Sequence, residues 1–228
     1  MVDTYRIRTN SFLDSKSTDS LMQLVTNEKK ERIKRFVHRE DALRCLLGDL
    51  LSRYALCRRT GLKNSELKYR VNEYNKPLLA TPVHLHFNVS HSGNWAVCAV
   101  ADKLVGIDVE YVKNIDLKIA ERFFTNYEYD SLLKQAPKDR IRYFYKLWTL
   151  KESYIKADGR GLSLPLDSFS IEINNDSISV ITDNELKSCL FEMCEIDDFH
   201  ISSVCSLDSS FNTTLKEVTY FDLLQALA

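Results

Sequence analysis

The order of the strand and helix patterns constrains the fold of this chain more than any other feature. A helical stripe of apolar residues over 42–54 precedes two short apolar strands at 86–90 and 95–100. A strand at 105–110, three helices and four more strands follow. Since helices and strands do not alternate strictly, the order favours an α+β fold over a doubly wound parallel sheet. The other elements predicted from the same periodicities are strands at 5–12, 67–71, 168–174, 177–181, 189–195 and 199–207, and helices at 21–25, 28–36, 116–125, 127–135, 139–157 and from 220 onward.

Two similar phrases divide the chain. The segments 95–102 and 200–208 are both short hydrophobic strands that end in aspartate, which is a hint of internal duplication. The chain of 228 residues is long enough for two small lobes that share an interface. We therefore expect two similar lobes, residues 1–103 and 104–228.

Charge and cysteine content exclude several classes of protein. The net charge is −1, so no global charge draws the chain to nucleic acid or to an anionic membrane. The N-terminus has no apolar core of signal-peptide length, and no apolar run approaches the length of a membrane span. The six cysteines form no Cys-x-x-Cys pair, which favours free thiols in a reducing compartment. We expect a cytoplasmic protein.

Two carboxylates interrupt the apolar strand at 105–110. Asp108 and Glu110 are two residues apart, so their side chains share one face of the strand, with Cα atoms roughly 6.5 Å apart. In the helix at 139–157, Glu152 and Lys156 share a face by their i,i+4 spacing. Taken separately, these pairs could be strand-end polar residues and a surface ion pair. Together they predict a Mg²⁺–pyrophosphate site, because Mg²⁺ commonly combines one or two carboxylates with substrate phosphates.

Several local cation sources could bind the phosphates. A helix start at 28–36 is rich in basic residues, including Lys29 and Arg32, although such a run is often only a solvated face. Arg44 lies beside the apolar stripe of the long helix, and Lys76 lies in a turn before a proline. The polar tip at 90–93 suits an anionic oxygen, the alternative being an ordinary β-turn.

A zinc site is disfavoured. His84, His86 and His91 are near one another in the sequence, but no cysteine or acidic ligand lies nearby at zinc spacing.

Three motifs give this chain a specific resemblance. They are Phe87–Ser92 (FNVSHS), Gly106–Glu110 (GIDVE) and Trp148–Lys156 (WTLKESYIK). In this order and spacing they resemble the signature motifs of the 4′-phosphopantetheinyl transferases. The likeness covers most of residues 27–170, and the length resembles the Sfp-type group rather than the half-sized trimeric holo-acyl-carrier-protein synthases.

The resemblance implies an activity and an architecture. The activity is Mg²⁺-dependent transfer of the 4′-phosphopantetheine arm of coenzyme A to a serine of apo peptidyl or acyl carrier proteins, releasing adenosine 3′,5′-bisphosphate. The architecture is a pseudo-twofold α+β fold with the active site between two lobes, in a monomer.

The resemblance also implies roles for individual residues. The Mg²⁺ ligands would be Asp108, Glu110 and Glu152. The residues that bind the nucleotide and phosphates of coenzyme A would be Lys29, Arg32, Arg44, Lys76, Ser90, His91, Lys151 and Lys156. The acceptor serine must lose a proton, directly or through water, and both Glu152 and Glu128 are candidate bases. We favour Glu152 because it lies at the metal, with Lys156 beside it.

The segment 111–125 follows the acidic strand directly, and the resemblance implies that it meets the carrier protein. We expect a small apolar patch rimmed by positive charge, the alternative being an ordinary amphipathic helix. A Mg²⁺-dependent hydrolase or nucleotidyl transferase is the alternative enzyme. A carrier-protein or RNA-binding module is the alternative without catalysis, although an RNA binder should have a basic surface.

Overall fold

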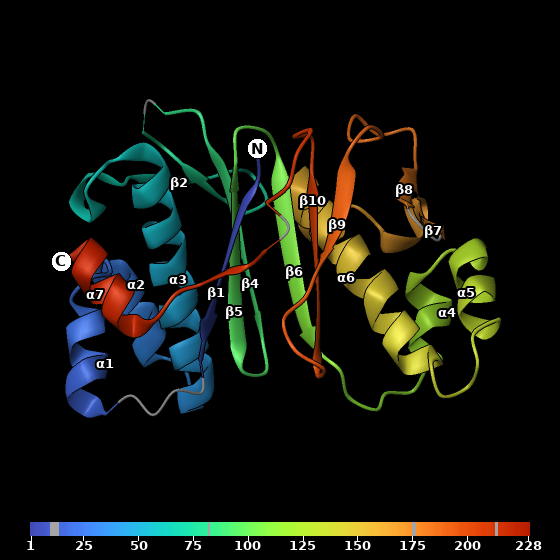
Figure 1. The fold of residues 1–228 in the computed structure, drawn as a ribbon, viewed down its shortest axis with the longest axis horizontal. Coiled ribbons are helices and arrows are strands. Elements are labelled where there is room, and N and C mark those ends of the chain that lie inside the picture. Colours follow the sequence, from blue (N-terminus) through green and yellow to red (C-terminus); the bar gives the residue numbers. More distant parts are fainter. Residues whose placement is uncertain (10–13, 82, 175–176, 213) are drawn as a thin grey trace.

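The computed structural model describes residues 1–9, 14–81, 83–174, 177–212 and 214–228. Helices and strands are mixed along the chain (Figure 1), which confirms the α+β prediction. The helices are α1 (Ser15–Met22), α2 (Asn27–Lys34), α3 (Arg39–Thr60), α4 (Ile119–Phe123), α5 (Asn126–Leu133), α6 (Arg140–Asp158) and α7 (Tyr220–Leu227). The strands are β1 (Asp3–Arg8), β2 (Tyr69–Val71), β3 (Pro77–Leu79), β4 (His86–Ser92), β5 (Trp95–Ala101), β6 (Val105–Tyr111), β7 (Ser170–Asn174), β8 (Ser177–Ile181), β9 (Leu190–Cys194), β10 (His200–Ser206) and β11 (Lys216–Glu217).

Some element ends differ from their prediction. The strand predicted at 5–12 is β1, which ends at Arg8, and residues 10–12 lie outside the described residues. The helix predicted at 21–25 begins earlier, because the Asp14 side chain accepts a hydrogen bond from the Ser17 amide and caps α1. The helix predicted at 116–125 is reduced to α4. The sequence pattern missed β3 and β11, which have three and two residues.

A four-stranded sheet forms the framework of the N-terminal half. Its strand order is β11-β1-β5-β4. All seven residues of β5 are buried, and α3 lies across the sheet with its apolar residues against β5 (Figure 1). Gly61 ends α3 in a left-handed conformation with φ 74°, as its position predicts.

A second sheet, β6-β10-β9, forms the framework of the C-terminal half, and α6 packs on it. Strand β6 and helix α6 approach each other closely at Gly106. A Cβ atom there would lie 2.0 Å from the Ser153 carbonyl oxygen and 2.4 Å from the Ala157 nitrogen. Because glycine has no side chain, the backbones of β6 and α6 can touch. The functional residues of β6 and α6 are thereby held next to each other.

Strands β4 and β6 lie side by side where the two halves meet (Figure 1). Side chains of β4 join them, because the Ile107 amide donates to Asn88 Oδ1 at 3.0 Å and the Tyr111 amide donates to Ser92 Oγ at 3.1 Å. Buried apolar residues of β5, β6 and β10, including Val97, Ile107 and Val204, form one cluster behind this junction. The junction fixes β4 against the acidic strand.

The end of the chain returns to the N-terminal half. Strand β11 pairs with β1 in parallel, and α7 packs on α3 (Figure 1). Val218, Leu223 and Leu227 are buried in the same cluster as the apolar stripe of α3. The last residues of the predicted 104–228 lobe thus pack on the other half, and the division into two duplicated lobes stays a prediction.

The six cysteines are free, and five of them are buried, as expected from their apolar surroundings. Within the described residues, no helix is long and apolar enough to cross a membrane.

Candidate active site

The carboxylates of β6 face hydroxyl groups of β4. Ser90 Oγ donates to Asp108 Oδ1 at 2.8 Å, and Ser92 Oγ donates to Glu110 Oε2 at 2.8 Å. Asp108 is only 3 % exposed. The alternation of the two strands therefore brings two predicted metal ligands and the predicted phosphate contact Ser90 together.

Helix α6 adds a cation to this group. Lys156 Nζ lies 2.6 Å from Asp108 Oδ1 and donates to Ser90 Oγ at 2.8 Å. The close approach of α6 at Gly106 explains why a helix side chain reaches β6 residues. Lys156 and Asp108 are thus brought together as the sequence motifs predict.

Glu152 belongs to the same acidic cluster. Burial raises its pKa to about 7, and the charges of Asp108 and Glu110 act in the same direction while Lys156 opposes them. Burial and the charge of Asp108 also raise the pKa of Glu110. Raised pKa values at neighbouring carboxylates such as Glu110 and Glu152 are expected where a cation is to be bound.

The cluster fits a hard divalent cation chemically. Asp108 Oδ2 is buried and receives no hydrogen bond from any described residue, so it can accept a ligand. The three carboxylates supply only oxygen ligands, as a hard cation prefers. Lys156 provides the positive charge beside Asp108 in this structure. Among the described residues, no three His, Cys, Asp or Glu side chains converge at ligating distance, so metal binding would require the carboxylates to draw together.

Lys151 and Glu128 form a separate pair inside the C-terminal half, and both side chains are 0 % exposed. Lys151 Nζ donates to Glu128 Oε1 at 2.5 Å, to Oε2 at 2.7 Å and to the Phe169 carbonyl oxygen at 2.7 Å. The amides of Ile171 and Thr125 donate to the Glu128 carboxylate at 2.7 and 2.9 Å. Neither residue has a free, accessible group for a phosphate or a serine hydroxyl. In this structure, Lys151 and Glu128 therefore make contacts that stabilise the fold instead of the phosphate and serine contacts predicted for them, and their part in the reaction stays a prediction.

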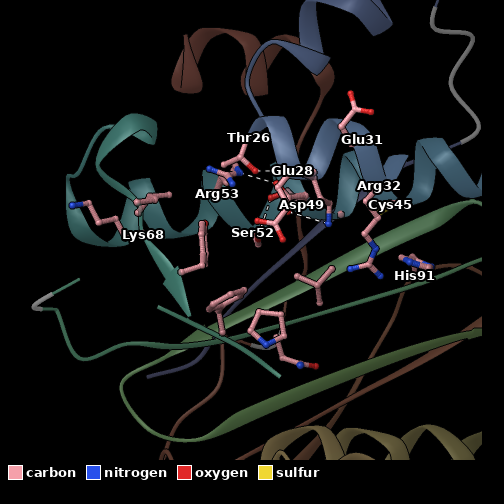
Figure 2. A pocket seen from close by; sticks show the side chains of 18 of the residues that line it. Thr26, Glu28, Glu31, Arg32, Cys45, Asp49, Ser52, Arg53, Lys68 and His91 are labelled. Atoms are coloured by element: carbon pink, nitrogen blue, oxygen red, sulfur yellow. Dashed lines mark hydrogen bonds and ion pairs between the residues drawn. The ribbon is translucent and has the colours of Figure 1, made fainter. Parts of the chain in front are cut away.

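A cavity of about 1020 Å³ opens in the N-terminal half between α2, α3 and β4 (Figure 2). Three predicted coenzyme contacts, Lys29, Arg32 and His91, line it. Burial, with the charges of Lys156 and Arg44, lowers the pKa of His91, so the ring is neutral at pH 7. Arg35 of the basic segment 28–36 also lines the cavity, as do Arg53 and Lys68, which the sequence patterns did not indicate.

Asp49 orders part of the cavity wall. Lys29 Nζ lies 3.1 Å from Asp49 Oδ1, and Arg53 Nε donates to Asp49 Oδ2 at 2.7 Å (Figure 2). The i,i+4 spacing of Asp49 and Arg53 on α3 is the sequence signal for this contact. The Asp49 carboxylate therefore holds Lys29 and Arg53 at the cavity. Arg32 lines another part of the cavity wall.

Arg44 and Lys76 do not line the cavity. Arg44 donates to the Gly93 carbonyl oxygen at 3.0 Å and so holds the turn after β4. Lys76 Nζ donates to the carbonyl oxygens of Lys156 and Ala157 near the end of α6, and burial lowers its pKa to about 8. Both cations therefore support elements that present Ser90, His91 and Lys156.

The turn that holds Lys76 contains a residue in the left-handed conformation. Asn75 has φ 65°, and Asn72 Oδ1 accepts hydrogen bonds from the amides of Tyr74 and Lys76. Asparagine tolerates this left-handed conformation better than most residues.

Comparisons with known proteins agree with the motifs. Residues 104–206 match the family described as "4′-phosphopantetheinyl transferase superfamily", and residues 14–103 match the one described as "4′-phosphopantetheinyl transferase, N-terminal". The chain is 39 % identical over 221 residues to 4′-phosphopantetheinyl transferase Sfp of Bacillus subtilis (strain 168), covering 96 % of this chain and 99 % of that protein. It is 37 % identical over 210 residues to 4′-phosphopantetheinyl transferase gsp of Aneurinibacillus migulanus, covering 92 % of this chain and 88 % of that protein. A solved structure of Thermotoga maritima holo-[acyl-carrier-protein] synthase aligns with a TM-score of 0.40 at 22 % identity, covering 46 % of this chain and 63 % of that one. On its sequence relatives, the chain belongs to the 4′-phosphopantetheinyl transferase family.

Proposed function

We propose that this protein transfers the 4′-phosphopantetheine arm of coenzyme A to a serine hydroxyl of an apo carrier protein, releasing adenosine 3′,5′-bisphosphate. The observation that supports this most is the continuity of β4 between two sites. His91 lines the basic cavity, while its neighbour Ser90 contacts Asp108 and Lys156. A ligand with a nucleotide at one end and a pyrophosphate next to it fits that arrangement.

The nucleotide end of coenzyme A would occupy the cavity. Lys29 and Arg32 would bind phosphate as cations, and the neutral His91 would act as a hydrogen-bonding group. The pyrophosphate would then lie at Ser90 and Lys156, at the edge of the acidic cluster. Lys156 is suited to this because its side chain is 26 % exposed, in contrast to the sealed Lys151.

Asp108, Glu110 and Glu152 would hold Mg²⁺. When bound there, the ion would neutralise the pyrophosphate and stabilise charge on the leaving oxygen. Glu152 would also accept the proton of the attacking serine, directly or through a water molecule. In the metal-free protein, burial raises the pKa of this carboxylate to about 7, so it is a stronger base than an ordinary glutamate.

The carrier protein would dock on residues 111–125. In this segment Tyr111 and Ile119 are each 41 % exposed, whereas Leu117 packs partly against the core of the C-terminal half. Lys118 is exposed next to Ile119. A small apolar patch with a basic neighbour would suit an acidic docking helix on the carrier.

We further propose that the protein is a cytoplasmic monomer.

One incubation tests the proposal against its alternatives. The protein, coenzyme A, Mg²⁺ and an apo carrier are mixed, and the intact mass of the carrier is measured. We expect a gain of one phosphopantetheine, and no gain on a control carrier whose acceptor serine is replaced by alanine. Hydrolysis of coenzyme A without a mass gain would instead support a hydrolase, and no turnover would support a binding module.

A further inference from the structure

A histidine–aspartate pair, in which only the histidine is buried, lies beside the turn that follows β4. His200, the first residue of β10, has a side chain that is 1 % exposed, and its Nδ1 lies 2.8 Å from Asp197 Oδ1. Neither residue belongs to the site described above.

His200 makes two contacts with the turn at residues 92–94 and a third with β6. The Asn94 amide donates to His200 Nε2 at 3.4 Å. A Cβ atom on Gly93 would lie 2.5 Å from the same nitrogen, so the ring fills the space that a side chain would need. The ring also packs on Tyr111, with centroids 5.1 Å apart.

These partners define the tautomer of His200. A carboxylate can only accept, so Nδ1 bears the hydrogen, and an amide N–H can only donate, so Nε2 is the acceptor. A neutral imidazole satisfies both contacts at once.

Asp197 fastens the other side of the same turn. Its Oδ2 accepts a hydrogen bond from Trp95 Nε1 at 2.8 Å, and its Oδ1 also accepts from the Phe199 amide at 2.9 Å. The hydrogen bonds from Trp95 and His200 outweigh burial and lower the pKa of Asp197 to about 2. The ionised carboxylate thus ties the start of β5 to the segment before β10.

The turn in question begins at a residue of the acidic site. Ser92 Oγ donates to Glu110 Oε2 at 2.8 Å and accepts from the Tyr111 amide at 3.1 Å. Any shift of the turn away from β6 would therefore remove a hydrogen bond from Glu110. His200 lies opposite Tyr111 in the β6–β10 register, so the pair acts from the strand next to β6.

We infer that Asp197 and His200 are positioning residues that hold Ser92 against Glu110 and thereby set the affinity of the acidic cluster for a divalent cation. This inference rests on the proposed metal role of Glu110. Hydrogen-bonded partners of ligating carboxylates orient the ligand, and their loss typically weakens metal binding by about 10- to 100-fold. Because Asp197 and His200 act on Glu110 only through Ser92, removing them should weaken metal binding by about tenfold, near the lower end of this range.

The test measures Mn²⁺ binding without turnover, from the electron paramagnetic resonance signal of free Mn²⁺ titrated with protein. His200→Phe keeps a ring beside Tyr111 but removes both hydrogen bonds, and we expect it to raise the Kd about tenfold. His200→Gln can still donate and accept, so its Kd should be closer to wild type. Phe199→Ala, at a neighbouring side chain that is 64 % exposed, is the matched control and should leave the Kd unchanged.

A double-variant cycle separates positioning from general damage. If the pair acts through Ser92, His200→Phe should have little further effect in a Ser92→Ala background. An unchanged Kd in His200→Phe, or additive effects of the two substitutions, would overturn the inference while leaving the metal site intact. Absence of Mn²⁺ binding to the wild-type protein would overturn the proposed metal site itself. If His200→Phe does not fold, Asp197→Ala, at a side chain that is 32 % exposed, makes the same comparison.

Discussion

Replacing Lys151 with methionine tests whether this lysine stabilises the fold or binds phosphate. The substitution removes three hydrogen bonds and leaves the Glu128 carboxylate buried, with the Ile171 and Thr125 amides and the Thr125 hydroxyl as its donors. Breaking a buried ion pair by removing one partner costs about 3–5 kcal/mol. In a chain of this length, that loss lowers the melting temperature by roughly 6–20 °C.

The double variant Glu128→Gln with Lys151→Met sharpens the test. It removes the buried charge while the amide oxygen can still accept from Ile171, so its free energy of unfolding should exceed that of Lys151→Met alone. Urea unfolding followed by tryptophan fluorescence measures both values, and turnover per folded molecule should stay near wild type in the double variant. Lost turnover in Lys151→Met with a free energy of unfolding within about 1 kcal/mol of wild type would refute this reasoning and place Lys151 at the reaction centre.

The remaining predictions concern the coenzyme, the acidic cluster and the carrier. Lys29→Ala should raise the KM for coenzyme A more than it lowers kcat, because Lys29 lines the cavity. The control Lys34→Ala, at a side chain on the same helix that is 64 % exposed, should change neither constant. A loss of kcat alone in Lys29→Ala would contradict a binding role. Without metal, Glu152 should make the protein less stable as the pH rises from about 4.5 to about 7, because its folded pKa lies above the ordinary value and the folded state binds the proton more tightly. Unfolding at a series of pH values should show this contribution missing in Glu152→Gln, and identical pH profiles would contradict it. Ile119→Asp should slow modification of the carrier protein without changing the KM for coenzyme A. Lys118→Glu should slow this modification mainly at low salt. If both variants modify the carrier at the wild-type rate, the carrier docks on another surface.

The acidic cluster could be predicted from the sequence because two simple periodicities produce it. The strand period of two places Asp108 and Glu110 on one face of β6. The i,i+4 spacing places Glu152 and Lys156 on one face of α6. The structure joins Asp108 to Lys156 directly and groups the three carboxylates electrostatically. Gly106 allows β6 and α6 to pack closely. Although Gly106 belongs to the same motif as Asp108 and Glu110, the sequence did not indicate its contact with α6.

The burial of Lys151 could have been predicted from the same periodicity. Lys151 is four residues after Leu147 and three before Tyr154, and both of these apolar side chains are buried. Its helical phase is therefore that of the core, while its sequence neighbour Glu152 points about 100° away around the helix. The resemblance of the motif concealed this difference in direction.

Other features depend on contacts between distant segments. Strand β11 pairs with β1 across more than two hundred residues of sequence, and its two residues have no strand pattern of their own. The Asn88 and Ser92 side chains join β4 to β6 through hydrogen bonds that no periodicity predicts. Arg53 and Lys68 line the cavity only because α3 and the segment before β2 fold around it.

The most direct measurement of the central claim is the intact mass of an apo carrier after incubation with coenzyme A, millimolar Mg²⁺ and the Asp108→Ala variant. Asp108 of β6 accepts hydrogen bonds from both Ser90 of β4 and Lys156 of α6. The substitution therefore removes the partner that these two side chains share. The account predicts that the wild-type protein adds one phosphopantetheine to the carrier. It also predicts that the folded variant, checked by circular dichroism, adds almost none in the same time. Modification by Asp108→Ala at the wild-type rate would contradict the account, because the acidic cluster on β6 would then not be the reaction centre.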